Sequence, residues 1–212
     1  MSKSEPLYFT EDDEANRLLG ENPLALLIGL VLYQQVSVDK AFMGPHVLKK
    51  RLGGVLNAQS IATKSPESLE ATFQESPAIH RFPTAMAKRV HALCSHLTDE
   101  FEGDPAAIWQ DAESGPEIIK RIKTLPGFGE YKAVVTLDVL VRRCHIETTD
   151  WERFKPAFPT VGDIDGPGQL DLFKERKKAW KALTDMRKRI QSERADSVRA
   201  ADEAVDNLLK GS

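Results

Sequence analysis

A short glycine-containing stretch is the part of this chain whose residue types and spacing best fit a chemical role, and it reads Leu125-Pro126-Gly127-Phe128-Gly129. A helix with an apolar face is predicted before it, over 116–124, and a second helix after it, over 130–142. Two glycines allow a turn through backbone conformations that are closed to other residues. The amide groups that begin the second helix face outward, and with the positive helix end they form a site for a phosphate. An ordinary corner between two helices could carry the same five residues.

The helices that must position this hairpin are marked by their capping signals. Asn22-Pro23, Ser65-Pro66 and Asp104-Pro105 each place a capping side chain before a proline at the first helical position. Apolar and polar residues do not alternate convincingly anywhere, and only 7–9 and 144–148 remain as candidate strands. The predicted class is therefore all-α, with helices over 23–35, 37–52, 58–63, 66–75, 84–101, 105–110, 116–124, 130–142, 151–157 and from about 169 onward.

The composition limits the classes of function. The 212 residues suffice for one good-sized domain or two small ones. The formal net charge of −3 argues against a histone-like DNA coat, but it permits an enzyme that contacts a few phosphates through a local patch. The two cysteines, Cys94 and Cys144, indicate neither a disulfide framework nor a metal site. Both are expected to be buried small apolar residues, which fits a reducing compartment.

The sequence contains no signal for a membrane. The N-terminal residues Met1 to Pro6 lack the apolar core of a signal peptide. The longest apolar run, Leu24 to Tyr33, has about half the length that a membrane span needs. We therefore expect a cytoplasmic protein without a membrane partner.

The hairpin resembles that of the helix-hairpin-helix (HhH-GPD) DNA glycosylase superfamily, in which L-P-G-x-G precedes a helix. A second stretch, Leu32-Tyr33-Gln34-Gln35-Val36-Ser37, is similar to the Q-Q-x-S element of the alkylbase branch of that superfamily. The resemblance covers roughly residues 22–185 and is closest to the short base-excision repair branch that lacks an iron–sulfur cluster. It implies a two-lobed helical fold with a cleft between the lobes and the hairpin on the rim of that cleft.

The resemblance implies that the partner is double-stranded DNA containing a damaged base, and that the protein is nucleoid-associated. A glutamine amide at the Q-Q-x-S joint can hydrogen-bond base edges without adding charge. Alternatively, Gln34 and Gln35 satisfy backbone groups at a helix junction. Arg81 lies in a loop with His80 before a helix carrying Lys88 and Arg89, and these cations contact phosphates or simply face solvent. The predicted DNA contacts are Gln34, Gln35, Ser37, Arg81, Leu125, Pro126, Gly127, Phe128, Gly129, Tyr131 and Lys132.

An aspartate is the predicted catalytic residue. In the glycosylase family, an aspartate follows the last hairpin glycine by about twenty residues, a spacing that lands on Thr149, and Asp150 is one position further. Cleavage of an N-glycosidic bond builds positive charge on the sugar, which a carboxylate can stabilise while it orients water. A plain helix cap ahead of Trp151 would also select an aspartate. The rivals, Asp138 and Glu130, lie within or at the start of the hairpin helix.

The residue two positions after Gly129 indicates the reaction subtype. Family members that also cut the strand carry a lysine there as a Schiff-base nucleophile, whereas this chain has Tyr131. Lys132 is one step along the helix, which turns it by about 100° and points it elsewhere. The resemblance therefore implies a monofunctional glycosylase that hydrolyses the N-glycosidic bond of a flipped base. Tyr131 could wall the base pocket or pack half-buried.

The resemblance also predicts cofactors. Two separated cysteines exclude the four-cysteine iron–sulfur loop of many family members, and no organic cofactor is expected. Hairpins of the family bind a monovalent cation through main-chain carbonyls. By position these would be the carbonyls of Lys123, Leu125 and Phe128, for Na⁺ or K⁺.

The predicted domain organisation is a glycosylase-like helical domain over 1–168, with the hairpin at 116–142, and a helical extension over 169–212. Residues 151–168 contain several prolines and glycines and are expected to form an irregular connector. An apolar stripe is expected to pack the first half of the extension onto the domain, and it consists of Leu170, Phe173, Trp180 and Leu183. The second half, Arg187 to Asn207, alternates in charge and is expected to be solvated or to bind a partner.

Two other classes of function remain open. A protein that binds damaged or distorted DNA without catalysis would keep the hairpin and need no acid. A helical scaffold would explain the charged C-terminal helix and the acidic net charge. The lesion and the oligomeric state cannot be read from the sequence.

Overall fold

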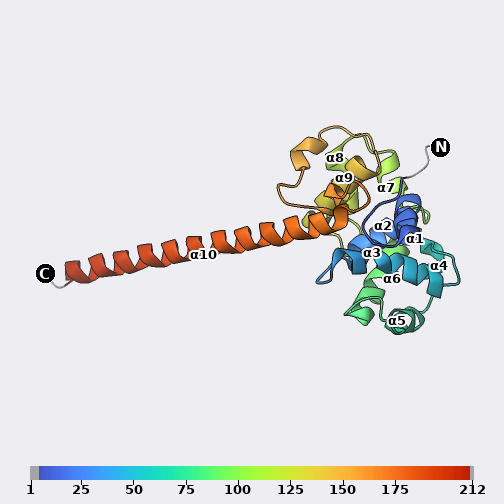
Figure 1. Cartoon of the computed structure of the whole chain (residues 1–212), viewed down its shortest axis with the longest axis horizontal. Coiled ribbons are helices and arrows are strands. Elements are labelled where there is room, and N and C mark those ends of the chain that lie inside the picture. Colours follow the sequence, from blue (N-terminus) through green and yellow to red (C-terminus); the bar gives the residue numbers. More distant parts are fainter. Residues whose placement is uncertain (1–4, 211–212) are drawn as a thin grey trace. The chain divides into compact units, whose positions relative to one another are not determined.

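The computed structural model describes residues 5–210, apart from the side chains of residues 201 and 204–210. Within this range the chain forms ten α-helices and two short 3-10 helices, without a β-strand, so the all-α class is confirmed (Figure 1). The chain divides into two compact units, of which the first ends at Phe173 and the second begins at Lys174.

The first unit contains nine complete helices and both 3-10 helices among its described residues. Their bounds are α1 Asp13–Glu21, α2 Pro23–Leu32, α3 Val38–Arg51, α4 Ala58–Ala62, α5 Pro66–Gln74, α6 Pro83–Glu100, α7 Ala107–Gln110, α8 Gly115–Ile122, α9 Glu130–Arg143, η1 Trp151–Phe154 and η2 Val161–Asp163. Helices α1 to α6 pack mainly on one another, whereas α8 and α9 pack together and contact η1.

Two of the three capping signals in the sequence produce the expected helix starts, whereas Asp104-Pro105 does not, because α7 begins at Ala107 without a side-chain cap. The side chain of Asn22 accepts a hydrogen bond from the amide of Ala25, and Pro23 occupies the first turn of α2. Ser65 caps α5 in the same way, by accepting from the amide of Ser68. These side chains satisfy amide groups that the first turn of a helix leaves unpaired.

Three local predictions are wrong. Residues 7–9 and 144–148 are not strands, and the one bridge in the described chain joins Ser114 to Thr149. Leu7 and Phe9 are buried as irregular chain against the helices, so their apolar pattern reflects the core. Helix α1 was not predicted, although Asp12 caps it through the amide of Ala15. The helix expected over 151–157 is only the 3-10 turn η1.

The long apolar run of the sequence is the central core helix α2. Every one of its residues from Leu24 to Leu32 is buried, so it carries no polar face. A helix that is apolar all round is surrounded by protein or lipid. In residues 5–210 no helix has both the length and the apolar character that crossing a bilayer requires.

Helix α10 (Gln169–Lys210) begins in the first unit and forms the described part of the second. Leu170 and Phe173 are buried, as expected of the apolar stripe. Trp180 and Leu183 are exposed, and the packing of this part of the helix onto the domain stays a prediction. The stripe is therefore buried only over the first turns of the helix. Cys94 is fully buried as predicted, while Cys144 is only partly buried.

Candidate nucleic-acid interface

The hairpin between α8 and α9 is a tight turn whose side chains face inward. The amide of Phe128 donates to the carbonyl of Leu125 over 3.1 Å, and Gly127 has a φ of +88°. With Pro126 before it, this is the pattern of a type II turn, which requires glycine at its third residue. Leu125 and Phe128 are buried, whereas Gly127 and Gly129 are exposed. The hairpin thus presents backbone to solvent.

The start of α9 keeps its amide groups free of a side-chain cap. Gly129 is the N-cap residue and has no side chain that could accept from them. Glu130 brings a negative charge to the first turn, and its carboxylate pairs with the ammonium group of Lys123 across the hairpin. Because Lys123 offsets that charge, the helix end remains compatible with an anion.

The joint that follows α2 carries a polar cluster built around Gln34. Its amide nitrogen donates to the carbonyl of Val31 over 2.9 Å, and its amide oxygen accepts from the guanidinium of Arg89 over 2.7 Å. Gln34 therefore does satisfy backbone at the junction, while Arg89, on α6, lies beside it. We call Val31, Gln34, His80, Arg89 and Lys132 the Gln34 cluster.

Lys132 reaches this cluster from α9. Its ammonium nitrogen donates to the carbonyl of Val31 over 3.0 Å and lies 5.6 Å from the centre of the Phe128 ring. Burial, with a smaller contribution from the charge of Arg89, lowers the pKa of Lys132 to about 8. The neighbouring residue points elsewhere, because Tyr131 is 57% exposed and stacks on Phe158. The helical rotation predicted this divergence, but the inward direction of Lys132 depends on tertiary contacts.

His80 fixes the joint from the other side. Its Nδ1 accepts from the amide of Phe82 over 3.0 Å, so Nε2 carries the hydrogen and donates to the carbonyl of Gln34 at 3.1 Å. Burial lowers the pKa of His80, which favours the neutral ring. Sequence reasoning placed His80 among loop cations and missed this role. Arg81 does face solvent, with its guanidinium 4.6 Å from the centre of the Phe82 ring.

The two remaining polar residues of the Q-Q-x-S joint, Gln35 and Ser37, are exposed, whereas Val36 is partly buried. Gln35 has a φ of +55°, a left-handed conformation that costs a residue with a side chain some strain. Such strain is found at functional sites, where surrounding contacts maintain it. Ser37 is the N-cap residue of α3, but its side chain makes no capping hydrogen bond. Both side chains are therefore available to a ligand.

Asp150 lies at the opposite end of α8 from the hairpin. The amide of Gly115, the first residue of α8, donates to the carbonyl of Thr149 over 2.8 Å. A helix of eight residues is about 12 Å long, which separates this region from the glycine turn. Asp150 precedes η1 with a φ of +59°, and its carboxylate pairs with Arg153 at 3.4 Å. No described contact joins Asp150 to the Gln34 cluster, and its catalytic role stays a prediction.

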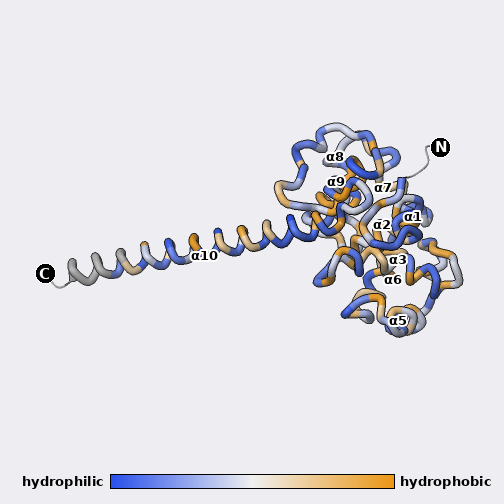
Figure 2. Tube along the Cα trace, viewed as in Figure 1, coloured by the Kyte–Doolittle hydropathy of each residue, from blue (hydrophilic) through white to orange (hydrophobic). Residues whose placement is uncertain are grey.

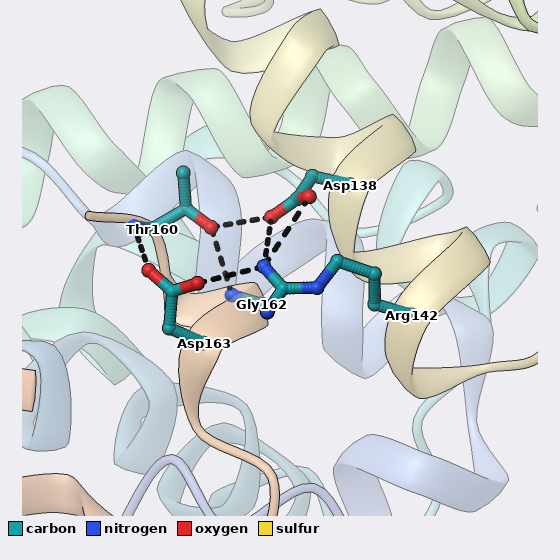
Figure 3. Close-up of polar contacts among 5 residues, drawn as sticks. All are labelled: Asp138, Arg142, Thr160, Gly162 and Asp163. Carbon is teal, nitrogen blue, oxygen red and sulfur yellow. Dashed lines mark hydrogen bonds and ion pairs between the residues drawn. The ribbon is translucent and has the colours of Figure 1, made fainter. Parts of the chain in front are cut away.

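A buried ionic cluster holds α9 in place (Figure 3). Asp138 is 1% exposed, accepts from the hydroxyl of Thr160 over 2.5 Å and pairs with Arg142 at 3.3 Å. Arg142 also pairs with Asp163 at 2.7 Å, and Asp163 accepts from the amide of Thr160. The Thr160 hydroxyl accepts in turn from the amide of Gly162. The Thr160 hydroxyl and Arg142 thus hold Asp138, which braces the hairpin helix.

The predicted cation site can be compared with the carbonyls that would form it. The carbonyl of Leu125 accepts the amide of Phe128, so one of its two lone pairs is already used. Lys123 is the C-cap residue of α8, where carbonyls lack helical partners. A monovalent cation at the carbonyls of Lys123, Leu125 and Phe128 stays a prediction. Among the described residues no cluster of three or more His, Cys, Asp or Glu side chains could hold a metal ion.

A cavity of about 440 Å³ in the first unit has unsuitable charge for a phosphate, although its lining residues 39–40 and 77–79 adjoin Ser37 and His80 in the chain. Carboxylates dominate its charged lining, with Glu11, Asp12 and Asp39 against Lys40. The rest of its lining includes apolar residues such as Met43 and Ile79. We therefore assign no nucleic-acid contact to it.

Comparison with known proteins gives no relative: the chain matches no family model, no curated protein and no solved structure.

Proposed function

We propose that this protein is a monofunctional DNA glycosylase of base-excision repair, which hydrolyses the N-glycosidic bond of a damaged base flipped out of double-stranded DNA. The observation that carries the proposal is the adjacency of the exposed glycine turn and the Gln34 cluster, which Lys132 connects. A backbone anion site and a set of amide and cationic donors then act on one stretch of DNA. The two-lobed glycosylase fold and the catalytic role of Asp150 belong to this proposal.

The hairpin supplies the phosphate contact in this scheme. The uncapped amides at the start of α9 bind a phosphate beside the lesion, and the exposed Gly127 allows the DNA backbone to approach closely. A Na⁺ or K⁺ ion held by the carbonyls of Lys123, Leu125 and Phe128 would bridge to the same strand.

The Q-Q-x-S joint supplies contacts to bases. Gln35 and Ser37 are exposed at the end of α2, and Gln34 is oriented by Arg89. An amide can fill the gap left by an extruded base or bond to the orphaned partner without adding charge. Flipping costs a few kcal/mol, so weakened pairs are preferred.

The proposal that the enzyme does not cleave the strand is based on the positions of Tyr131 and Lys132. Tyrosine cannot form a Schiff base, and the Lys132 amine is engaged by the Val31 carbonyl. Its pKa of about 8 nevertheless leaves a neutral fraction near neutral pH. A trapping reaction with borohydride therefore belongs in any assay of this protein.

A second function is favoured by the position of Asp150. Because this carboxylate lies by the start of α8 and pairs with Arg153, the hairpin can operate without it. The chain would then be a non-catalytic protein that binds damaged or distorted DNA.

The test is release of bases from a panel of duplexes that each carry one damaged base. Wild-type protein is compared with Asp150→Asn and with Asp165→Asn, which makes the same charge change at an exposed position. Hot alkali afterwards cleaves abasic sites. We expect alkali-dependent cleavage with wild type and Asp165→Asn and loss with Asp150→Asn.

Three results separate the alternatives. Base release that survives Asp150→Asn removes the catalytic role of this residue alone. Strand cleavage without alkali, trapped by borohydride and lost in Lys132→Ala, contradicts the monofunctional assignment. Binding to duplexes without release of any base in the panel favours the non-catalytic function.

A further inference from the structure

The distal part of α10 carries a second apolar stripe, which is distinct from the one expected at the start of the helix and is called the stripe below. It consists of Leu183, Met186, Ile190 and Val198, which are between 53% and 67% exposed. At 100° per residue, these four positions fall within a sector of about 120° around the helix. Figure 2 shows short hydrophobic stretches along a mainly hydrophilic α10.

The stripe belongs to a stretch of helix that lacks packing. From residue 185 to residue 200 every side chain is exposed. Most helical stability in proteins comes from the packing of an apolar face rather than from intrinsic propensity. Large apolar side chains repeated on one face of an otherwise charged helix therefore indicate a partner that covers them.

The charge along α10 is unevenly distributed. Residues 174–189 contain eight lysines and arginines against two acidic residues. Residues 192–207 contain five acidic residues against two arginines. The boundary between the basic and acidic halves falls next to Ile190, near the middle of the stripe.

We propose that the stripe is the interface of a homodimer in which two copies of α10 pair in antiparallel orientation. Placing Leu183 of each copy opposite Val198 of the other brings the two Ile190 side chains together at the centre. The basic residues 174–189 of one helix then lie along the acidic residues 192–207 of its partner. A parallel pair would instead align the two basic halves, and such repulsion selects against it.

Arg187 and Arg194 limit the strength of this interface. Both fall within the sector of the stripe, and Arg187 of one helix lies opposite Arg194 of the other. Their guanidinium groups must therefore reach past the partner to solvent while their aliphatic stems cover apolar surface. The pair of helices is therefore a moderate, concentration-dependent interaction. It depends on the flanking charges and weakens as salt rises. This inference is independent of the proposed glycosylase function.

The oligomeric state of the full chain tests the interface. Sedimentation equilibrium over a concentration series compares wild type with Ile190→Asp and with Ser192→Asp, which puts the same charge on the opposite face of the helix. Burying an unpaired carboxylate should raise the dimer dissociation constant at least about tenfold in Ile190→Asp. Ser192→Asp should remain close to wild type. A monomeric wild type, or a dimer indifferent to Ile190→Asp, overturns the proposal.

Disulfide trapping tests the orientation. Leu183→Cys and Val198→Cys proteins, distinguished by a tag, are mixed and oxidised, and wild type reports any reaction of its own Cys94 and Cys144. Antiparallel pairing predicts a disulfide between the two different variants. A disulfide formed by Val198→Cys alone requires parallel helices and contradicts the proposal.

Duplex DNA is the competing occupant of α10, because its first half is basic. The same variants are therefore assayed for duplex binding. Weaker DNA binding by Ile190→Asp together with an unchanged oligomeric state would assign the face to nucleic acid and reject the dimer. We expect Ile190→Asp to change the oligomeric state directly, without DNA.

Discussion

The ammonium nitrogen of Lys132 lies 3.0 Å from the main-chain oxygen of Val31, and this hydrogen bond joins residues 101 positions apart in the sequence. It ties the start of α9, directly behind the glycine hairpin, to the end of α2. The side chain of Gln34 donates to the same oxygen at 2.9 Å. The hairpin and the Q-Q-x-S joint are therefore held together at one carbonyl.

Replacement of Lys132 should separate DNA binding from stability. In Lys132→Met the carbonyl of Val31 keeps its bond from Gln34 and a buried charge is removed, so the variant should be no less stable than wild type at pH 7. Duplex affinity should fall at least about fivefold, because a positive charge beside the hairpin is lost. Fluorescence anisotropy measures the affinity. The control is Lys88→Met, which removes an exposed cation of α6 that pairs with Glu70. This substitution should leave the duplex affinity nearly unchanged.

The pKa of Lys132 gives this contribution a pH dependence. Burial lowers the pKa from 10.5 to about 8, so the ammonium charge disappears as pH rises through 8. The difference in duplex affinity between wild type and Lys132→Met should therefore shrink between pH 7 and pH 9. The folding stability changes with pH in the opposite direction. The unfolded chain binds the Lys132 proton more tightly than the folded protein does. The unfolding free energy of wild type should therefore rise relative to that of Lys132→Met as pH rises from about 8 toward 10.5. An affinity ratio that is flat across pH 8 would contradict the assignment.

The protein should be strongly destabilised when Arg142, the cation that pairs with the buried Asp138, is removed. Arg142→Met leaves the Asp138 carboxylate with the Thr160 hydroxyl as its remaining partner among the contacts in Figure 3. Since Arg142 is itself partly exposed, we expect a loss of about 2–4 kcal/mol in urea unfolding. Arg153→Met breaks the exposed pair with Asp150 and should cost less than about 0.5 kcal/mol. Equal effects of the two substitutions would show that Asp138 needs no cation.

Two glycines of the connector should respond differently to alanine. A Cβ at Gly162 would lie 2.3 Å from Oδ2 of Asp138, and a Cβ at Gly166 would meet nothing within 4 Å. Gly162→Ala must displace a buried carboxylate that is held by Thr160 and Arg142, and it should cost about 1–3 kcal/mol. Gly166→Ala should be neutral or stabilising by about 0.4–1 kcal/mol. Thermal unfolding compares them, and a Gly162→Ala protein as stable as wild type would contradict the tight packing.

The sequence predicted those parts of the fold that local chemistry determines. Asn22 and Ser65 cap their helices because capping needs only the next three residues. The turn at Gly127 followed from proline and glycine in adjacent positions. Helix α1 was missed because a nine-residue helix carries only a short apolar pattern, although Asp12 supplies a capping signal. Residues 7–9 were misread because buried irregular chain has the same apolar signal as a strand.

The candidate site was predicted only as separate pieces. Gln34, Lys132 and the hairpin could be named, but sequence spacing cannot show that Lys132 and Gln34 share one carbonyl. The role of His80 depends on a contact with a residue 46 positions away. The position of Asp150 depends on the bond between Gly115 and Thr149, which no local pattern indicates.

The most direct test of the glycine hairpin as a DNA-binding element is duplex affinity as a function of salt, with a lesion analogue in the DNA. Gly127→Ala is compared with Gly53→Ala, because both residues have positive φ, at +88° and +78°. Each substitution should cost about 1–2 kcal/mol of stability. We predict that affinity falls steeply with salt, that Gly127→Ala weakens it at least about tenfold with a slope lower by about 1, and that Gly53→Ala binds like wild type. Absence of salt-dependent binding, or equal binding by the two variants, would contradict the proposed function.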